Sequence, residues 1–180
     1  ATASSEQSFT DTHSFSSFSQ FKNTGNFNAT KDIGVLDAQV LGYQAIYNFK
    51  TEKIEKYEAL VRLIDEENIA ISPYYFLDVA KKSKLYLKLT KQVIKKSFEY
   101  FKDKDYEFSI NLTLEDITNK NISSYIVDML KEYKIASRVV FEIVESEGIQ
   151  DFEYVNNFID SVKKLGCKIA IDDFGSGYSN

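Results

Sequence analysis

The stretch VVFEIVESEGIQDFEYVNNFIDSVKKLGCKIAID, residues 139–172, contains a strand, a helix and a second strand in close succession. Val139–Val144 and Lys168–Asp172 are short apolar runs of the kind that form buried strands. Between them, residues 152–165 carry apolar side chains at helical spacing, and Gly166 ends the helix. Two strands joined through a helix predict a parallel pair with a crossover connection.

The same alternation extends toward the N-terminus. Residues 39–49 and 57–63 predict two strands of a hairpin around the polar turn Lys50–Lys56. Further along, Ser72–Pro73 begins a predicted helix, and further patterns predict helices over 90–101 and 122–133 and a strand over 108–112. An open doubly wound sheet and a (β/α)8 barrel both fit this order, so the pattern alone leaves the choice open.

Composition narrows the class of protein. The chain has 180 residues, 43% of them hydrophobic, and a single Cys, which excludes a disordered chain and a disulfide-stapled one. A net charge of −5 argues against a nucleic-acid surface, and no apolar run reaches the roughly 20 residues of a membrane segment. We therefore expect a cytoplasmic protein. Residues 1–38, rich in Ser and Phe, are interpreted as a tail or linker before a domain over 39–180.

Four carboxylates lie in or at the end of apolar strands, where a charge is costly unless it is paired or bound to a cation. They are Glu58, Glu142, Asp172 and Asp173, and Asn111 ends another strand. Because parallel strands bring their C-terminal ends together, we expect the last three of these carboxylates and Asn111 to gather at one mouth. Oxygen donors without His or Cys favour Mg²⁺, Mn²⁺ or Ca²⁺.

Other interpretations of the same residues stay open. Strand alternation predicts that Glu58, Leu60 and Arg62 share one face, where Arg62 could hold a phosphate with two hydrogen bonds. Glu58 and Arg62 could equally form a buried ion pair. Asn111 could be a strand-end cap, and Asp172 with the residue after it could begin an Asx turn.

Five motifs resemble those of one family in order and approximate spacing. They are Tyr43–Ile46 (YQAI), Glu58–Arg62 (EALVR), Ile110–Thr113 (INLT), Phe141–Ser146 (FEIVES) and Asp172–Ser179 (DDFGSGYS). Together they resemble the EAL-domain cyclic di-GMP phosphodiesterases over roughly residues 40–180. Ala45, Leu63 and Val144 replace the family's Pro, Trp and Thr, and none of these changes removes a metal ligand.

The resemblance implies a fold and a reaction. The fold is an α/β (β/α)8 TIM-type barrel with an antiparallel first strand, of which about the first five strands occur in this chain. The reaction is the hydrolysis of cyclic di-GMP to the linear dinucleotide in bacterial second-messenger signalling. The implied cofactors are two Mg²⁺ or Mn²⁺ ions, with Ca²⁺ as an inhibitory ion.

The resemblance also assigns roles to individual residues of this sequence. It implies metal ligands at Glu58, Asn111, Glu142, Asp172 and Asp173, of which Glu58, Asp172 and Asp173 are also catalytic. It further implies cyclic di-GMP contacts at Gln44, Leu60 and Arg62. Glu145 would anchor the loop that begins at Asp173.

Partners and activity follow as further expectations. The resemblance implies a homodimer through EAL domains and a fused sensory or GGDEF-type domain. A later Lys, Glu and Gln of the family's site have no counterpart in these 180 residues, so we expect this chain by itself not to hydrolyse cyclic di-GMP. The alternative is a non-catalytic EAL-like module that binds cyclic di-GMP or a protein partner.

Overall fold

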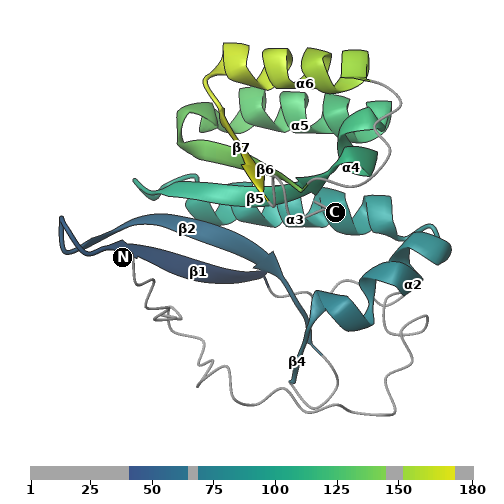
Figure 1. Ribbon diagram of the computed structural model, residues 1–180, viewed down its shortest axis with the longest axis horizontal. Coiled ribbons are helices and arrows are strands. Elements are labelled where there is room, and N and C mark those ends of the chain that lie inside the picture. The colour runs from purple at the N-terminus through teal and green to yellow at the C-terminus, as the bar shows by residue number, and fades with distance from the viewer. Residues whose placement is uncertain (1–40, 65–68, 145–151, 173–180) are drawn as a thin grey trace, which may run out of the picture. The chain divides into compact units, whose positions relative to one another are not determined.

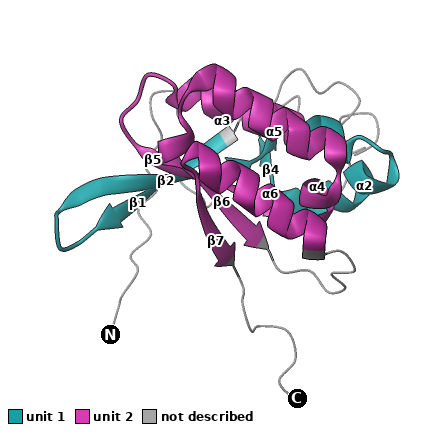
Figure 2. Cartoon of the chain, turned by 90° about the horizontal axis from the view of Figure 1, so that it is seen from above, with its two compact units in different colours: residues 1–89 teal, residues 90–180 magenta. Residues whose placement is uncertain are grey.

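The computed structural model describes residues 41–64, 69–144 and 152–172 (Figure 1). The predicted tail over residues 1–38 lies outside this part, as do Glu145 and Asp173. The chain divides into two compact units, residues 1–89 and residues 90–180, which are coloured separately in Figure 2. Each unit is described in turn.

The first unit begins with the predicted hairpin, in which β1 (Leu41–Asn48) pairs antiparallel with β2 (Lys53–Val61). The turn is shorter than predicted, because β2 begins at Lys53 and not near residue 57. The side-chain oxygen of Asn48 accepts a hydrogen bond from the Lys50 amide at 2.8 Å, and Glu52 takes the left-handed conformation at φ 56°. Residues 53–56, which the sequence predicts as part of the turn, instead belong to β2, which pairs with β1.

The predicted helix start at Ser72–Pro73 is wrong in part. Pro73 begins a 3-10 turn, η2 (Pro73–Tyr75), and the α-helix α2 (Leu77–Lys82) starts only after it. The Ser72 side chain makes no capping hydrogen bond. Two strands of two residues each, β3 (Leu63–Ile64) and β4 (Ala70–Ile71), pair antiparallel. Leu63 and Ile71 of this pair pack against these helices. The core of this unit is formed by Leu63, Ile71, Phe76, Ala80, Tyr86 and Leu89.

The second unit contains the predicted parallel strands. In it, β6 (Val139–Val144) lies between β5 (Glu107–Thr113) and β7 (Lys168–Asp172), and both pairings are parallel. The helices α5 (Lys120–Tyr133) and α6 (Phe152–Leu165) pack side by side (Figure 1). Gly166 ends α6 at φ 107°, as predicted. The helix α3 (Tyr86–Phe101), the short helix α4 (Leu114–Thr118) and the 3-10 turn η3 (Ala136–Arg138) complete the described elements.

One face of β5 packs against α3 through aromatic rings. The Phe101 ring stacks on the Phe108 ring with 4.3 Å between centroids, and Phe98 meets Phe108 edge-on at 6.1 Å. Phe108, Ile110 and Leu112 are at most 1% exposed. Because strand side chains alternate, this burial directs Asn111 to the opposite face of β5.

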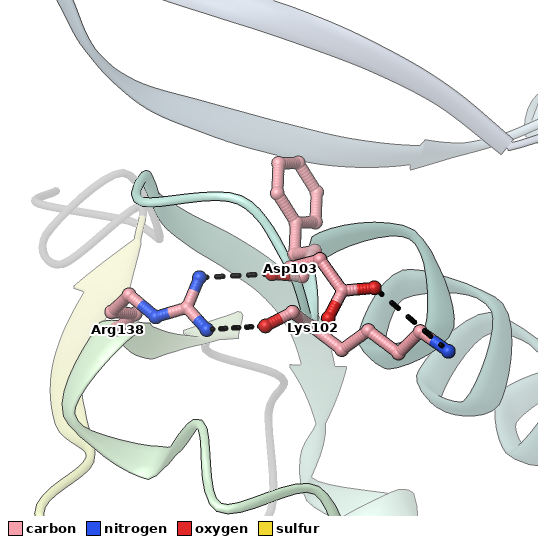
Figure 3. Close-up of polar contacts among 4 residues, drawn as sticks. Lys102, Asp103 and Arg138 are labelled. Carbon is pink, nitrogen blue, oxygen red and sulfur yellow. Dashed lines mark hydrogen bonds and ion pairs between the residues drawn. The ribbon is translucent and has the colours of Figure 1, made fainter.

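The C-terminal end of α3 is held by Arg138, which lies just before β6 (Figure 3). Its Nη1 donates hydrogen bonds to the carbonyl oxygens of Phe101, at 2.9 Å, and Lys104, and its Nη2 donates to that of Lys102, at 3.1 Å. The Phe101 carbonyl also accepts a hydrogen bond from the Lys104 amide at 3.1 Å, so the guanidinium adds charged donors to the last residue of α3 and to the turn after it. Arg138 thereby fixes the turn that leads into β5.

We expect Arg138→Met to lower the free energy of unfolding by about 1–3 kcal/mol, because it leaves several carbonyl groups without their charged donor. Urea unfolding followed by circular dichroism would measure the change. Lys102→Met is the matched control, since the exposed Lys102 ammonium lies 3.9 Å from the Asp103 carboxylate and such a pair contributes less than about 1 kcal/mol. Equal losses for the two variants would contradict the role given to Arg138.

Candidate functional site

Three of the predicted site residues share one face of the hairpin in the first unit. Gln44 and Glu58 are direct partners in the β1–β2 register, and Leu60 is the partner of Gly42 on the same face. Gln44, Glu58 and Leu60 are all half-buried, whereas Ala59, on the other face of β2, is 4% exposed. The hairpin therefore presents an amide, a carboxylate and an apolar side chain together.

Arg62 lies one residue beyond the end of β2, so the predicted strand over 57–63 is too long at this end. The Nη1 of Arg62 donates a hydrogen bond to the Val61 carbonyl at 2.7 Å. Burial lowers the pKa of Arg62, and the nearby Glu58 carboxylate opposes that shift. A half-buried guanidinium close to one carboxylate fits an ion pair, and its remaining donors fit a phosphate.

In the second unit, Asn111 on β5 and Glu142 on β6 are direct partners in the parallel register. Neighbouring strands lie about 4.8 Å apart, so these two side chains stand next to each other on one face. Asn111 is exposed and Glu142 is half-buried, whereas Phe141 and Ile143 beside Glu142 are at most 5% exposed. The amide and the carboxylate therefore lie side by side, each two residues before the C-terminal end of its strand.

Asp172 is the last residue of β7, where its backbone pairs with Val144, two residues beyond Glu142 on β6. The strand ends thus carry Asn111, Glu142 and Asp172 in consecutive strands. Asp173 and Glu145, which the sequence places next to this group, lie outside the described residues.

The oxygen donors of Asn111 and Glu142 fit a hard divalent cation such as Mg²⁺ or Mn²⁺. Across residues 41–64, 69–144 and 152–172, no group of three or more His, Cys, Asp or Glu side chains could hold a metal ion. The described residues of the second unit therefore bring together an amide–carboxylate pair. The complete set of five predicted ligands stays a prediction.

One polar group near this pair was missed in the sequence. Asp116, in the first turn of α4, is 1% exposed. Its carboxylate accepts hydrogen bonds from the Thr113 amide and hydroxyl, both at 2.9 Å, and from the Thr90 hydroxyl at 2.8 Å. The spacing Thr113-x-x-Asp116 is a capping-box signal that could have been found, whereas the contact with Thr90 has no local signal.

Cys167 is a packing residue. Its side chain is 5% exposed, and burial raises the pKa of the thiol to about 12. Because the thiolate is the reactive form, this environment opposes a nucleophilic role. No helix among the described residues has the length and apolar character to cross a membrane.

The parallel strands with intervening helices in the second unit, and the antiparallel hairpin in the first, are elements that an α/β-barrel type of domain contains. The family model of the EAL domain matches residues 36–180. The chain therefore belongs to the EAL domain family, as its motifs indicate.

Curated relatives and solved structures agree with this assignment. Signaling protein YkoW of Bacillus subtilis is 30% identical over 150 residues, and cyclic di-GMP phosphodiesterase PdeA of Borreliella burgdorferi is 29% identical over 150 residues. Each match covers 80% of this chain but only 19% and 22% of the respective relative, so the chain spans about a fifth of their length.

Among solved structures, Vibrio cholerae LapD, an S helix-GGDEF-EAL protein bound to c-di-GMP, superposes with a TM-score of 0.69. The identity is 18%, and the match covers 83% of this chain and 37% of LapD. This likeness confirms the predicted EAL-type barrel fold, of which this chain contains part.

We expect the Cys167 thiol to react slowly with Ellman's reagent at pH 8 in the folded protein, because a thiol with a pKa of about 12 is almost entirely protonated there. The rate should rise with pH, and the thiol should react rapidly once urea unfolds the chain. Absorbance at 412 nm reports the reaction of this residue alone, since the sequence has one Cys. Rapid labelling of the folded protein at pH 8 would contradict the assignment.

Proposed function

We propose that this EAL domain serves the metal-dependent hydrolysis of cyclic di-GMP to the linear dinucleotide. The observation that carries the proposal is the register pairing of Asn111 with Glu142 near the C-terminal ends of two parallel strands. Relatives named cyclic di-GMP phosphodiesterases and a similar structure bound to c-di-GMP support it. The chain spans about a fifth of the length of these relatives, so the phosphodiesterase activity of a whole protein that contains it is also a proposal.

The proposed metal ligands are those that the resemblance implies. They are Glu58, Asn111, Glu142, Asp172 and Asp173, with Glu58, Asp172 and Asp173 also taking part in catalysis. Bound Mg²⁺ or Mn²⁺ would polarise phosphoryl oxygens and lower the pKa of a water molecule. Asn111 contributes a neutral oxygen and Glu142 a charged one, and this mixture suits such ions.

The proposed cyclic di-GMP contacts are Gln44, Leu60 and Arg62. The hairpin face supports this role, because it places an amide and an apolar side chain beside the Glu58 carboxylate. Arg62 supplies local positive charge in a chain with a net charge of −5, which a phosphodiester ligand needs. Glu145 is proposed to anchor the loop that begins at Asp173.

The homodimer, the cytoplasmic location and inhibition by Ca²⁺ stay predictions. A fused GGDEF-type domain is proposed with the support of LapD, which combines GGDEF and EAL domains. Incubation with cyclic di-GMP and Mg²⁺ or Mn²⁺, followed by chromatography, tests the reaction. Linear product supports hydrolysis and contradicts the expectation that this chain by itself is inactive. Binding of cyclic di-GMP without product fits both that expected inactivity and the non-catalytic module. If the chain neither binds nor cleaves cyclic di-GMP, the proposed function fails and the protein-binding alternative is left.

We expect Arg62→Ala to weaken cyclic di-GMP binding by about 10- to 100-fold, the range for loss of charge-assisted hydrogen bonds worth about 1.5–3 kcal/mol. Isothermal titration calorimetry measures the dissociation constant. Lys50→Ala is the control, because it removes one positive charge at the exposed hairpin turn. Equal affinity of the Arg62→Ala variant and the unsubstituted chain would remove Arg62 from the proposed site.

We expect Glu142→Gln to weaken Mn²⁺ binding by about tenfold or more, because it replaces a charged oxygen ligand with a neutral one of the same shape. Mn²⁺ titration followed by electron paramagnetic resonance measures free metal directly. Glu132→Gln is the control, because exposed Glu132 lies in the last turn of α5, before the N-terminal end of β6, and the variant makes the same chemical change there. An unchanged affinity in Glu142→Gln would contradict the proposed metal site.

A further inference from the structure

The residues Thr90, Thr113 and Asp116 form a hydrogen-bonded group that we call the Asp116 network. One carboxylate oxygen of Asp116 accepts from the Thr90 hydroxyl, and the other accepts from the Thr113 amide and hydroxyl. The amide of Asp116 in turn donates to the Thr113 hydroxyl at 3.3 Å, which completes a capping box. Thr90 is 8% exposed and Asp116 is 1% exposed, so the network is buried.

The network fastens the C-terminal end of β5. Thr113 is the last residue of that strand, Asp116 begins the helix after it, and Thr90 belongs to α3, 26 residues earlier than Asp116. Asn111 is two residues before Thr113 and is the register partner of Glu142. Each hydrogen bond of the network has a side-chain acceptor, so the network holds this strand end through contacts other than backbone pairing in the sheet.

Capping of a short helix does not by itself explain a buried carboxylate. The helix α4 has five residues, and a Thr at the N-cap already accepts a bond from its first turn. Burying a carboxylate is costly, and an apolar residue at such a position is often at least as stabilising. Besides its hydrogen bonds within the capping box, the Asp116 carboxylate accepts one from the Thr90 hydroxyl, and this bond joins the end of β5 to α3.

We propose that the Asp116 network positions Asn111 beside Glu142 for cation binding, with Asp116 and Thr90 as positioning residues. Binding sites need their side chains held within about 0.5 Å of the productive geometry, so a strand end that moves by more should lose affinity. Fixing Thr113 to both α3 and α4 limits the movement of Asn111 relative to β6. Because the inference rests on the function proposed above, its test must separate the two.

Thr90→Val removes the hydroxyl that donates from α3 to Asp116, and it keeps the shape of the side chain and the capping box of Thr113 and Asp116. Thr90→Ser restores the hydroxyl and should rescue the effect. Thr118→Val is the matched control, because the Thr118 hydroxyl bonds only within α4, to the Leu114 carbonyl at 2.8 Å and the Glu115 carbonyl at 3.4 Å. Arg138→Met is the second control, a destabilising change before the N-terminal end of β6.

The probe is Mn²⁺ alone, titrated at a temperature at which every variant is folded by circular dichroism. We expect Thr90→Val to bind Mn²⁺ about tenfold more weakly, the lower end of the cost of losing a residue that supports a metal ligand. Thr90→Ser, Thr118→Val and Arg138→Met should bind like the unsubstituted chain. A purely structural role would instead lower the melting temperature and leave the affinity of the folded protein unchanged.

The outcomes separate the two proposals. If the unsubstituted chain binds Mn²⁺ and Thr90→Val binds it equally well, the positioning role is overturned and the proposed function stands. If the unsubstituted chain binds neither Mn²⁺ nor cyclic di-GMP, the proposed function fails and the inference fails with it. If Thr90→Val does not fold, Asp116→Asn, which keeps the side-chain shape, is measured in the same way and should also weaken binding about tenfold.

Discussion

The parallel register between β5 and β6 is the constraint on which the candidate site depends. It makes Asn111 and Glu142 direct partners, and because strand side chains alternate, a slip of one residue would turn one of them to the opposite face. The register is specified by burial on the helix-facing side. Phe108 and Ile110 on β5 and Phe141 on β6 are at most 1% exposed, and a slip would expose them or bury the polar pair.

Two charged side chains hold β5 at its opposite ends. Arg138 binds the carbonyl groups of the turn that enters the strand, and Asp116 binds the Thr113 amide and hydroxyl where the strand ends. Neither contact belongs to the sheet, so the position of β5 does not rely on backbone pairing alone. The Asp116 contact lies at the C-terminal end of β5, two residues from Asn111, whereas the Arg138 contact lies before the N-terminal end, so only the Asp116 contact is proposed to position Asn111.

Apolar periodicity predicted the second unit well. The bounds of β6, α6 and β7 follow the predicted segments residue for residue, because their buried faces repeat with a clear period. The prediction failed where polar residues dominate. The start of β2 at Lys53 lies in an exposed ribbon, and the Ser72–Pro73 signal produced a 3-10 turn before the true helix.

The sequence by itself determined the family, through five ordered motifs, and the identity of the candidate oxygen ligands. It also predicted that Asn111 and Glu142 lie on neighbouring parallel strands, near their C-terminal ends. Only the tertiary structure decided which side chains meet: Thr90 with Asp116, Arg138 with the end of α3, and the burial that raises the pKa of Cys167. These contacts join segments 26 to 37 residues apart or depend on surrounding packing, and neither local propensity nor periodicity encodes them.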